Sequence, residues 1–73
     1  MTNKIDLHGI RHHEVQNLLD KFLTKHLYQG TKEIYIITGN SEKMKIVVDS
    51  VLSDYNLSSE YSFLSKAELI VKL

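Results

Sequence analysis

Glu33-Ile34-Tyr35-Ile36-Ile37-Thr38 is the stretch that decides the fold. It is β-branched and aromatic, and it is apolar on both of its faces, a pattern typical of a central strand. Gly39-Asn40-Ser41 follows at once and breaks the strand, and Asn40 or Ser41 can cap a helix. We therefore expect a buried strand over residues 33–38 that leads through a tight loop into a helix.

Two helices are predicted, one before and one after this strand. The first covers residues 11–28 and stops at Gly30, because glycine is the usual residue just beyond a helix end. The second begins near residue 41 and is closed by Asn56. Both repeat apolar residues at helical spacing. The predicted inner stripes are Val15, Leu18, Leu19, Phe22, Leu23, His26 and Leu27 in the first helix, and Met44, Val47, Val48, Val51, Leu52 and Tyr55 in the second.

Three further strands complete the expected order β-α-β-α-β-β. Lys4-Ile5-Asp6-Leu7-His8 alternates with period two, and Gly9 ends it. Ile5 and Leu7 share one face of this strand, so Asp6 and His8 share the other. Two short strands are predicted at residues 61–64 and 68–72, with a tight turn at Ser65-Lys66 between them.

The expected fold class is α/β, as an α+β two-layer sandwich in one domain over residues 1–73. Strands joined through a helix are parallel and almost always connected with a right-handed crossover, so both helices cover the same sheet face. A four-stranded mixed sheet then has one bare face. That face presents either Tyr35 and Ile37 or Ile34 and Ile36, with Ile70 nearby. Apolar surface there would suit a homodimer or another protein partner.

Composition restricts the function classes. The chain has 73 residues, nine basic and nine acidic, and no cysteine, which excludes disulfides, thiolate metal sites and cysteine nucleophiles. The net charge of zero argues against a strong nonspecific grip on nucleic acid, which needs many phosphate contacts. No apolar run approaches the roughly 20 residues of a membrane span. We expect a soluble, cytoplasmic protein with no membrane partner.

The candidate site lies where two loops should meet. Ligands of open α/β sheets bind beyond the carboxyl ends of parallel strands, which here are Asp6-Leu7-His8-Gly9 and Thr38-Gly39-Asn40-Ser41. The second loop also opens a helix, whose N-terminal N–H groups and dipole suit a phosphate. Gly39 lets the backbone approach a ligand closely.

The residue types at this place can do acid–base chemistry. Asp6 and His8 are two residues apart on one strand face, so their Cα atoms are about 6.5–7 Å apart and both side chains could reach one phosphate, water or metal ion. A carboxylate can act as a base or hold a metal, and an imidazole can exchange a proton near neutral pH. Arg11 and His12, with His13, add cationic contacts to a phosphate backbone.

Simpler structural explanations stand beside each of these. An Asp-x-His pair at a strand end can be a hydrogen-bonded turn, and Thr-Gly-Asn-Ser can be only a helix start. His26 packs on the inner stripe of its helix, and the adjacent His12 and His13 diverge by about 100°. Spacing alone leaves a metal site of Asp6, His8 and His12 open. Lys43 and Lys45 can be solvated charge on the second helix.

Two segments resemble a known family. Ile5-Asp6-Leu7-His8-Gly9-Ile10 resembles the Leu-Asp-Leu-His-Gly-Leu opening of the Smr (small MutS-related) domain, and the helix with Glu14 near its start is similar to the one that follows in that family. Ile36-Ile37-Thr38-Gly39 looks like the second signature, a Thr-Gly-x-Gly or His-Gly-x-Gly loop. Ala67 to Leu73 fits the last strand, so the resemblance covers nearly the whole chain.

The resemblance implies a fold like the C-terminal domain of bacterial translation initiation factor three, with sheet order 1-2-4-3 and the last strand antiparallel. It implies nucleic-acid binding and, as in many members, endonuclease or nicking activity on RNA or DNA. Some members act on RNA at stalled ribosomes. By motif, Asp6 and His8 are the catalytic or nucleic-acid-contacting pair, Gly9 is the turn, and Thr38 and Gly39 form the phosphate-facing loop. A nuclease of this kind could use a divalent ion such as magnesium as its cofactor. Together with the residue types around both loops, this gives the expected nucleic-acid or phosphate contacts Gly9, Arg11, His12, Thr38, Gly39, Asn40, Ser41 and Lys43.

The sequence departs from the family pattern at Ser41, which stands where the second loop glycine usually lies. The basic loop that many members carry before the last strand is also very short. Three functions therefore remain open: a nuclease of the Smr type, a nucleic-acid-binding module that does not cleave, and a protein-interaction domain that uses the bare sheet face.

Overall fold

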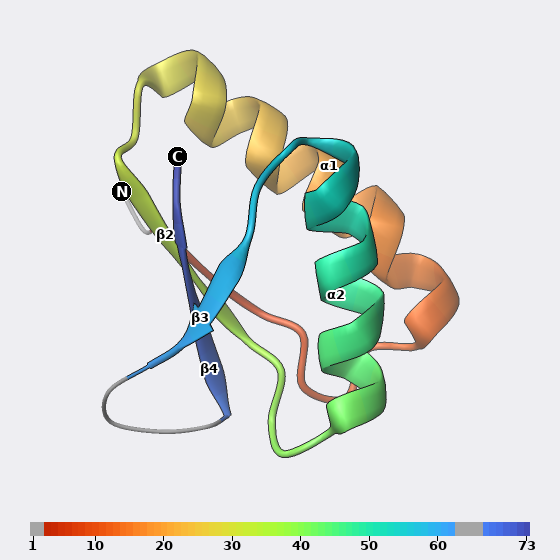
Figure 1. Ribbon diagram of the computed structural model, residues 1–73. Coiled ribbons are helices and arrows are strands. Elements are labelled where there is room, and N and C mark those ends of the chain that lie inside the picture. The colour runs from red at the N-terminus through yellow and green to blue at the C-terminus, as the bar shows by residue number, and fades with distance from the viewer. Residues whose placement is uncertain (1–2, 63–66) are drawn as a thin grey trace.

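The central strand of the sheet is β2 (Glu33–Ile37), which pairs in parallel with β1 (Lys4–Asp6) and antiparallel with β4 (Glu68–Lys72). The edge strand β3 (Ser59–Tyr61) pairs antiparallel with β4, which gives the sheet order β1-β2-β4-β3. The structure is a computed structural model that describes residues 3–62 and 67–73. The predicted mixed sheet and its strand order are confirmed (Figure 1).

Two helices form the second layer. α1 (His12–Gln29) and α2 (Glu42–Asp54) lie on the same side of the sheet (Figure 1), as the right-handed crossovers predict. Ile34 and Ile36 of β2 point toward these helices and are fully buried. The buried apolar core consists of Leu7, Val15, Leu19, Leu23, Ile34, Ile36, Met44, Val48, Val51, Leu52, Leu69 and Val71.

The predicted inner stripe of α1 is too wide. Leu18 and Leu27 are 37% and 45% exposed, because a two-layer domain covers a helix on one side only. His26 is buried as predicted, with its Nδ1 atom 2.8 Å from the Thr31 hydroxyl. The centre of the Phe22 ring lies 4.5 Å from the centre of the His26 ring.

Helix ends follow the sequence signals closely. Gly30 adopts a φ of 74° beyond α1, and the Ser41 hydroxyl caps α2 by accepting a hydrogen bond from the Met44 N–H at 3.1 Å. Asn56, with a φ of 59°, turns the chain after α2. The Tyr55 hydroxyl donates to the Asp20 carboxylate at 2.8 Å and joins the two helices, and this bond raises the pKa of Tyr55.

Two strand boundaries differ from prediction. β1 ends at Asp6 rather than His8, because the chain enters a turn at Leu7, whose carbonyl accepts the Ile10 N–H. β3 begins at Ser59 rather than residue 61, because its pairing with β4, Ser59 opposite Val71, is set by register and not by apolar alternation. The end of the predicted strand and the predicted turn at Ser65-Lys66 fall on residues 63–66, which lie outside the described residues.

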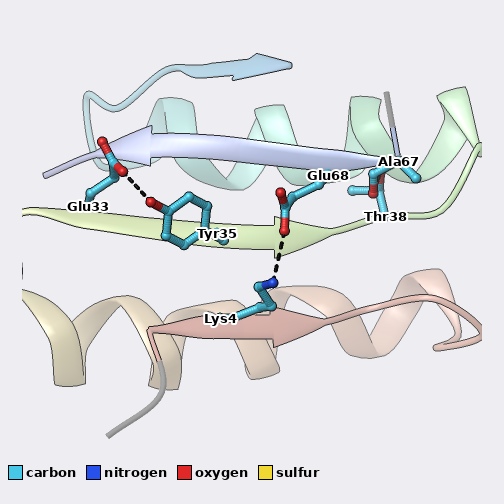
Figure 2. Close-up of polar contacts among 6 residues, drawn as sticks. All are labelled: Lys4, Glu33, Tyr35, Thr38, Ala67 and Glu68. Atoms are coloured by element: carbon cyan, nitrogen blue, oxygen red, sulfur yellow. Dashed lines mark hydrogen bonds and ion pairs between the residues drawn. The ribbon is translucent and has the colours of Figure 1, made fainter. Parts of the chain in front are cut away.

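The bare face of the sheet presents Tyr35, Ile37 and Ile70, which is the first of the two predicted alternatives. These side chains are half-buried, not open. Lys4 reaches across β2 to the Glu68 carboxylate at 3.2 Å, and the Tyr35 hydroxyl donates to Glu33 (Figure 2). That bond raises the pKa of Tyr35. A protein partner for this face stays a prediction.

In residues 3–62 and 67–73, neither helix combines the length and apolar character that crossing a membrane requires.

Because the core is thin, a single buried side chain should carry much of the stability. Leu52→Ala in α2 removes a fully buried side chain, and we expect it to lower the free energy of unfolding by about 2–5 kcal/mol. Ile46→Ala in the same helix is the matched control, since Ile46 is 68% exposed. Urea unfolding followed by circular dichroism measures both variants. Equal losses for the two would contradict the assigned faces of α2.

Candidate functional site

The pairing of β1 with β2 brings the two predicted loops together. The Leu7 N–H donates to the Ile37 carbonyl at 2.8 Å and extends the parallel ladder one residue beyond β1. The chain therefore leaves both strands at the same edge of the sheet. We call residues Leu7 to Ile10 the His8 turn and residues Thr38 to Ser41 the Gly39 loop.

The His8 turn is fixed by two hydrogen bonds. The Ile10 N–H donates to the Leu7 carbonyl at 3.0 Å, and the His8 N–H donates to the Asp6 carboxylate at 2.9 Å. Gly9 has a φ of 83°, which the third position of such a turn needs. Leu7 is fully buried and anchors the turn in the core. The Asp-x-His pair is thus a hydrogen-bonded turn that leaves the His8 side chain exposed.

The Gly39 loop is fixed by the chain that enters β4. The Ala67 carbonyl accepts the N–H of Thr38 at 2.8 Å and that of Gly39 at 3.1 Å. Thr38 is 3% exposed and lies beside Ala67 (Figure 2). The Gly39 N–H is therefore committed to the protein. The first turn of α2 offers the N–H groups of Glu42 and Lys43, which lack intrahelical acceptors by geometry, whereas the Met44 N–H is bound by the Ser41 hydroxyl.

The His8 ring packs directly on Gly39. A Cβ atom at Gly39 would lie 2.7 Å from Cδ2 of His8, closer than any real contact, and the φ of Gly39 is 70°. Glycine is therefore required there for two reasons, the backbone conformation and the space for the imidazole. This contact joins the two sequence motifs into one surface.

An open groove of about 820 Å³ lies between the His8 turn and the Gly39 loop. Among the described residues that line it, none is acidic, whereas one arginine and three histidines are present. Most of the predicted contacts line this groove, and Ile10, His13 and Met44 complete it. Its lining consists of His8, Gly9, Ile10, Arg11, His12, His13, Thr38, Asn40, Ser41 and Met44.

Three predicted site residues are not part of the groove lining. Asp6 pairs in register with Ile37, whose side chain faces the bare side of the sheet, so the two predicted partners Asp6 and His8 do not face one groove. Gly39 lies behind the His8 ring. Lys43 is exposed on α2, outside the groove.

Ser41 fits its position without strain. Its φ of −87° and ψ of 110° are ordinary for any residue, so a second loop glycine is not needed for the backbone conformation. Its oxygen accepts from Met44, which leaves the hydroxyl proton free to donate toward the groove. The departure from the family pattern adds a donor at the groove wall.

The described residues contain no group of three or more His, Cys, Asp or Glu side chains that could hold a metal ion. The alternative metal site of Asp6, His8 and His12 is therefore not formed. The Asp6 carboxylate instead accepts the His8 backbone N–H.

A smaller hollow of about 100 Å³ lies on the other side of the Gly39 loop. Lys45 and Tyr61 line it, together with Glu42 and the loop itself. Lys45 is not plain solvated charge, because its ammonium lies 2.7 Å from the Asp49 carboxylate, and this bond raises the pKa of Lys45. Sequence reasoning missed Tyr61, since only strand register brings β3 to this loop.

Comparison with known protein families shows to which family the chain belongs. The Smr domain model matches residues 5–68. The chain belongs to the Smr domain family. Both signatures of the family, the His8 turn and the Gly39 loop, fall within the match. The Smr domain is known for nucleic-acid binding and nicking. No significant match was found among curated proteins or solved structures.

The contact between the two signatures predicts an effect of Gly39→Ala. The new methyl group displaces the His8 ring, so the NMR resonances of His8 shift strongly. Gly30→Ala is the matched control, because Gly30 has a similar φ of 74° but open space around it. Both variants lose about 1–2 kcal/mol from backbone strain. An unmoved His8 ring in the Gly39 variant would refute the contact.

Proposed function

We propose that this Smr domain binds the sugar-phosphate backbone of nucleic acid in the groove and nicks it there. The observation that carries the proposal is the His8 ring, held on Gly39 at a groove wall that is basic and free of carboxylates among the described residues. Family membership supports the same function.

Binding uses the charge that lines the groove. Arg11 lies at the start of α1 and can contact a phosphate with two parallel hydrogen bonds. His12 and His13 follow it, and the N-terminal end of α2 contributes backbone donors and a positive dipole. Contacts of this kind fix the position of a nucleic acid without reading its sequence.

Cleavage is assigned to His8, because its side chain is the proton-exchanging group that the turn presents to the groove. In the proposed step, a water or an RNA 2′-hydroxyl attacks phosphorus and the bond to the leaving oxygen breaks. His8 takes the proton of the attacking water or hydroxyl, and solvent water supplies a proton to the leaving oxygen. The described residues form no cluster of three metal-ligating side chains, so the step is written with His8 and solvent.

Asp6 then acts as a positioning residue. Its carboxylate holds the His8 backbone N–H at 2.9 Å, which fixes where the imidazole lies. Its carboxylate is not among the side chains that line the groove. This same observation favours the second candidate function, a module that binds nucleic acid without cutting it.

Asp6 variants separate a positioning role from direct chemistry. Labelled single- and double-stranded RNA and DNA are incubated with the wild type and with the variants Asp6→Asn, Asp6→Ala and His8→Ala. The amide oxygen of Asp6→Asn can still accept the His8 N–H, so we expect it to keep most of the cleavage. Asp6→Ala loses more, and His8→Ala loses about 100-fold or more.

The result also separates the two functions. Cleavage that is equal in wild type and His8→Ala would overturn the assignment of His8. Binding without any cleavage by the wild type would establish the second function. RNA cut only where a 2′-hydroxyl is present would indicate transesterification, and cleavage of DNA would indicate hydrolysis.

Salt dependence tests the binding groove independently of cleavage. Arg11→Ala removes one phosphate contact, so it should weaken binding and reduce the slope of log affinity against log salt by about one. Lys21→Ala, an equal change of charge on the exposed surface of α1, is the control. Fluorescence anisotropy at several salt concentrations measures both. Equal slopes of log affinity against log salt for the two variants would show that Arg11 does not contact a phosphate.

A further inference from the structure

Tyr61 is an exposed aromatic ring beside the Gly39 loop. In β3 it pairs with Leu69, which is fully buried, so Tyr61 lies on the helix side of the sheet. It is nevertheless 47% exposed. The smaller hollow lies between this ring, the Gly39 loop and the first turn of α2.

The ring is held in place by its neighbours. The Lys45 ammonium lies 5.2 Å from the centre of the Tyr61 ring, within the range of a cation–π contact. Asp49 binds Lys45 at 2.7 Å and accepts the Ser59 hydroxyl at 2.6 Å. Asp49 thus ties β3 to α2, so that an aromatic surface of fixed position stands next to the hollow.

The charges of the hollow do not suit a phosphate. Lys45 is the cation that lines it, and its charge is offset by Asp49 and by Glu42, which also lines the hollow. A flat, uncharged group that packs on a ring fits this setting better than an anion. Nucleobases stack on aromatic side chains in this way, and the stacking tolerates any base.

The two sites share a wall. Thr38, Asn40 and Ser41 line both the groove and the hollow. The Gly39 loop is therefore the wall between the two sites. A strand whose phosphates occupy the groove can cross this loop and lay a base against Tyr61. A base inside a duplex cannot, because it is already stacked and paired.

We propose that Tyr61 and the hollow beside it form a base-stacking subsite, and that the ligand is single-stranded nucleic acid or an unpaired nucleotide. The subsite rests on the proposed function, since it receives a base from the strand that the groove holds. It assigns unpaired strand as the substrate class of this domain.

Tyr61→Ala tests the subsite. The probes are fluorescein-labelled single-stranded RNA and DNA of about ten nucleotides and duplexes of the same sequence. We expect Tyr61→Ala to weaken single-strand binding about 5-fold or more and to leave duplex binding unchanged. The ratio of wild-type to variant affinity stays constant as salt is raised, because stacking releases no counterions.

Three variants provide the controls. Tyr61→Phe keeps the aromatic ring and should bind single strands as the wild type does. Tyr61→Leu keeps a large apolar side chain without an aromatic ring and should lose as much single-strand affinity as Tyr61→Ala. If Tyr61→Ala does not fold, this Phe–Leu pair decides the question. Tyr28→Ala removes a tyrosine that is 92% exposed at the C-terminal end of α1 and should leave binding unchanged.

The outcomes separate the subsite from the proposed function. If Arg11→Ala weakens single-strand binding and Tyr61→Ala does not, the groove is supported and the subsite is overturned. Equal loss of single-strand and duplex binding on Tyr61→Ala also overturns it. A wild-type protein that binds none of the probes overturns both proposals.

Discussion

The parallel pairing of β1 with β2 is the constraint on which the site depends. It is short, with three residue pairs and the added bond from Leu7 to the Ile37 carbonyl. Because both strands run the same way, their following loops leave at one edge of the sheet. The His8 ring can then pack on Gly39, and this packing brings together two motifs that are some thirty residues apart.

The sheet also separates the charges of a chain whose net charge is zero. Arg11 and three of the four histidines, His8, His12 and His13, line the groove, which has no acidic side chain among its described residues. Asp6, Glu33 and Glu68 lie on the bare face with Lys4. The net charge is a sum over the whole chain and does not describe how charged side chains are distributed on the surface. A domain with zero net charge can therefore still present a basic groove to a phosphate backbone.

The loops that shape the groove are held by the protein's own hydrogen bonds. The Asp6 carboxylate and the Ala67 carbonyl occupy N–H groups of the His8 turn and the Gly39 loop. The groups left for a ligand are side chains and the open end of α2. A site that is already bonded in this way keeps its shape without a ligand, and this reduces the ordering that binding would require.

The sequence by itself predicted the element order, the parallel direction of strands joined through a helix, the buried His26, a helix cap at Asn40 or Ser41, and the two loops of the site. These follow from local spacing, turn residues and the handedness of crossovers. Only the tertiary structure decided that the Asp6 carboxylate binds the His8 backbone N–H while the His8 ring packs on Gly39, because a turn that starts at Leu7 ends the alternation of the strand. It likewise brought Tyr61 beside the Gly39 loop, since the register of an edge strand depends on its partner and not on its own pattern.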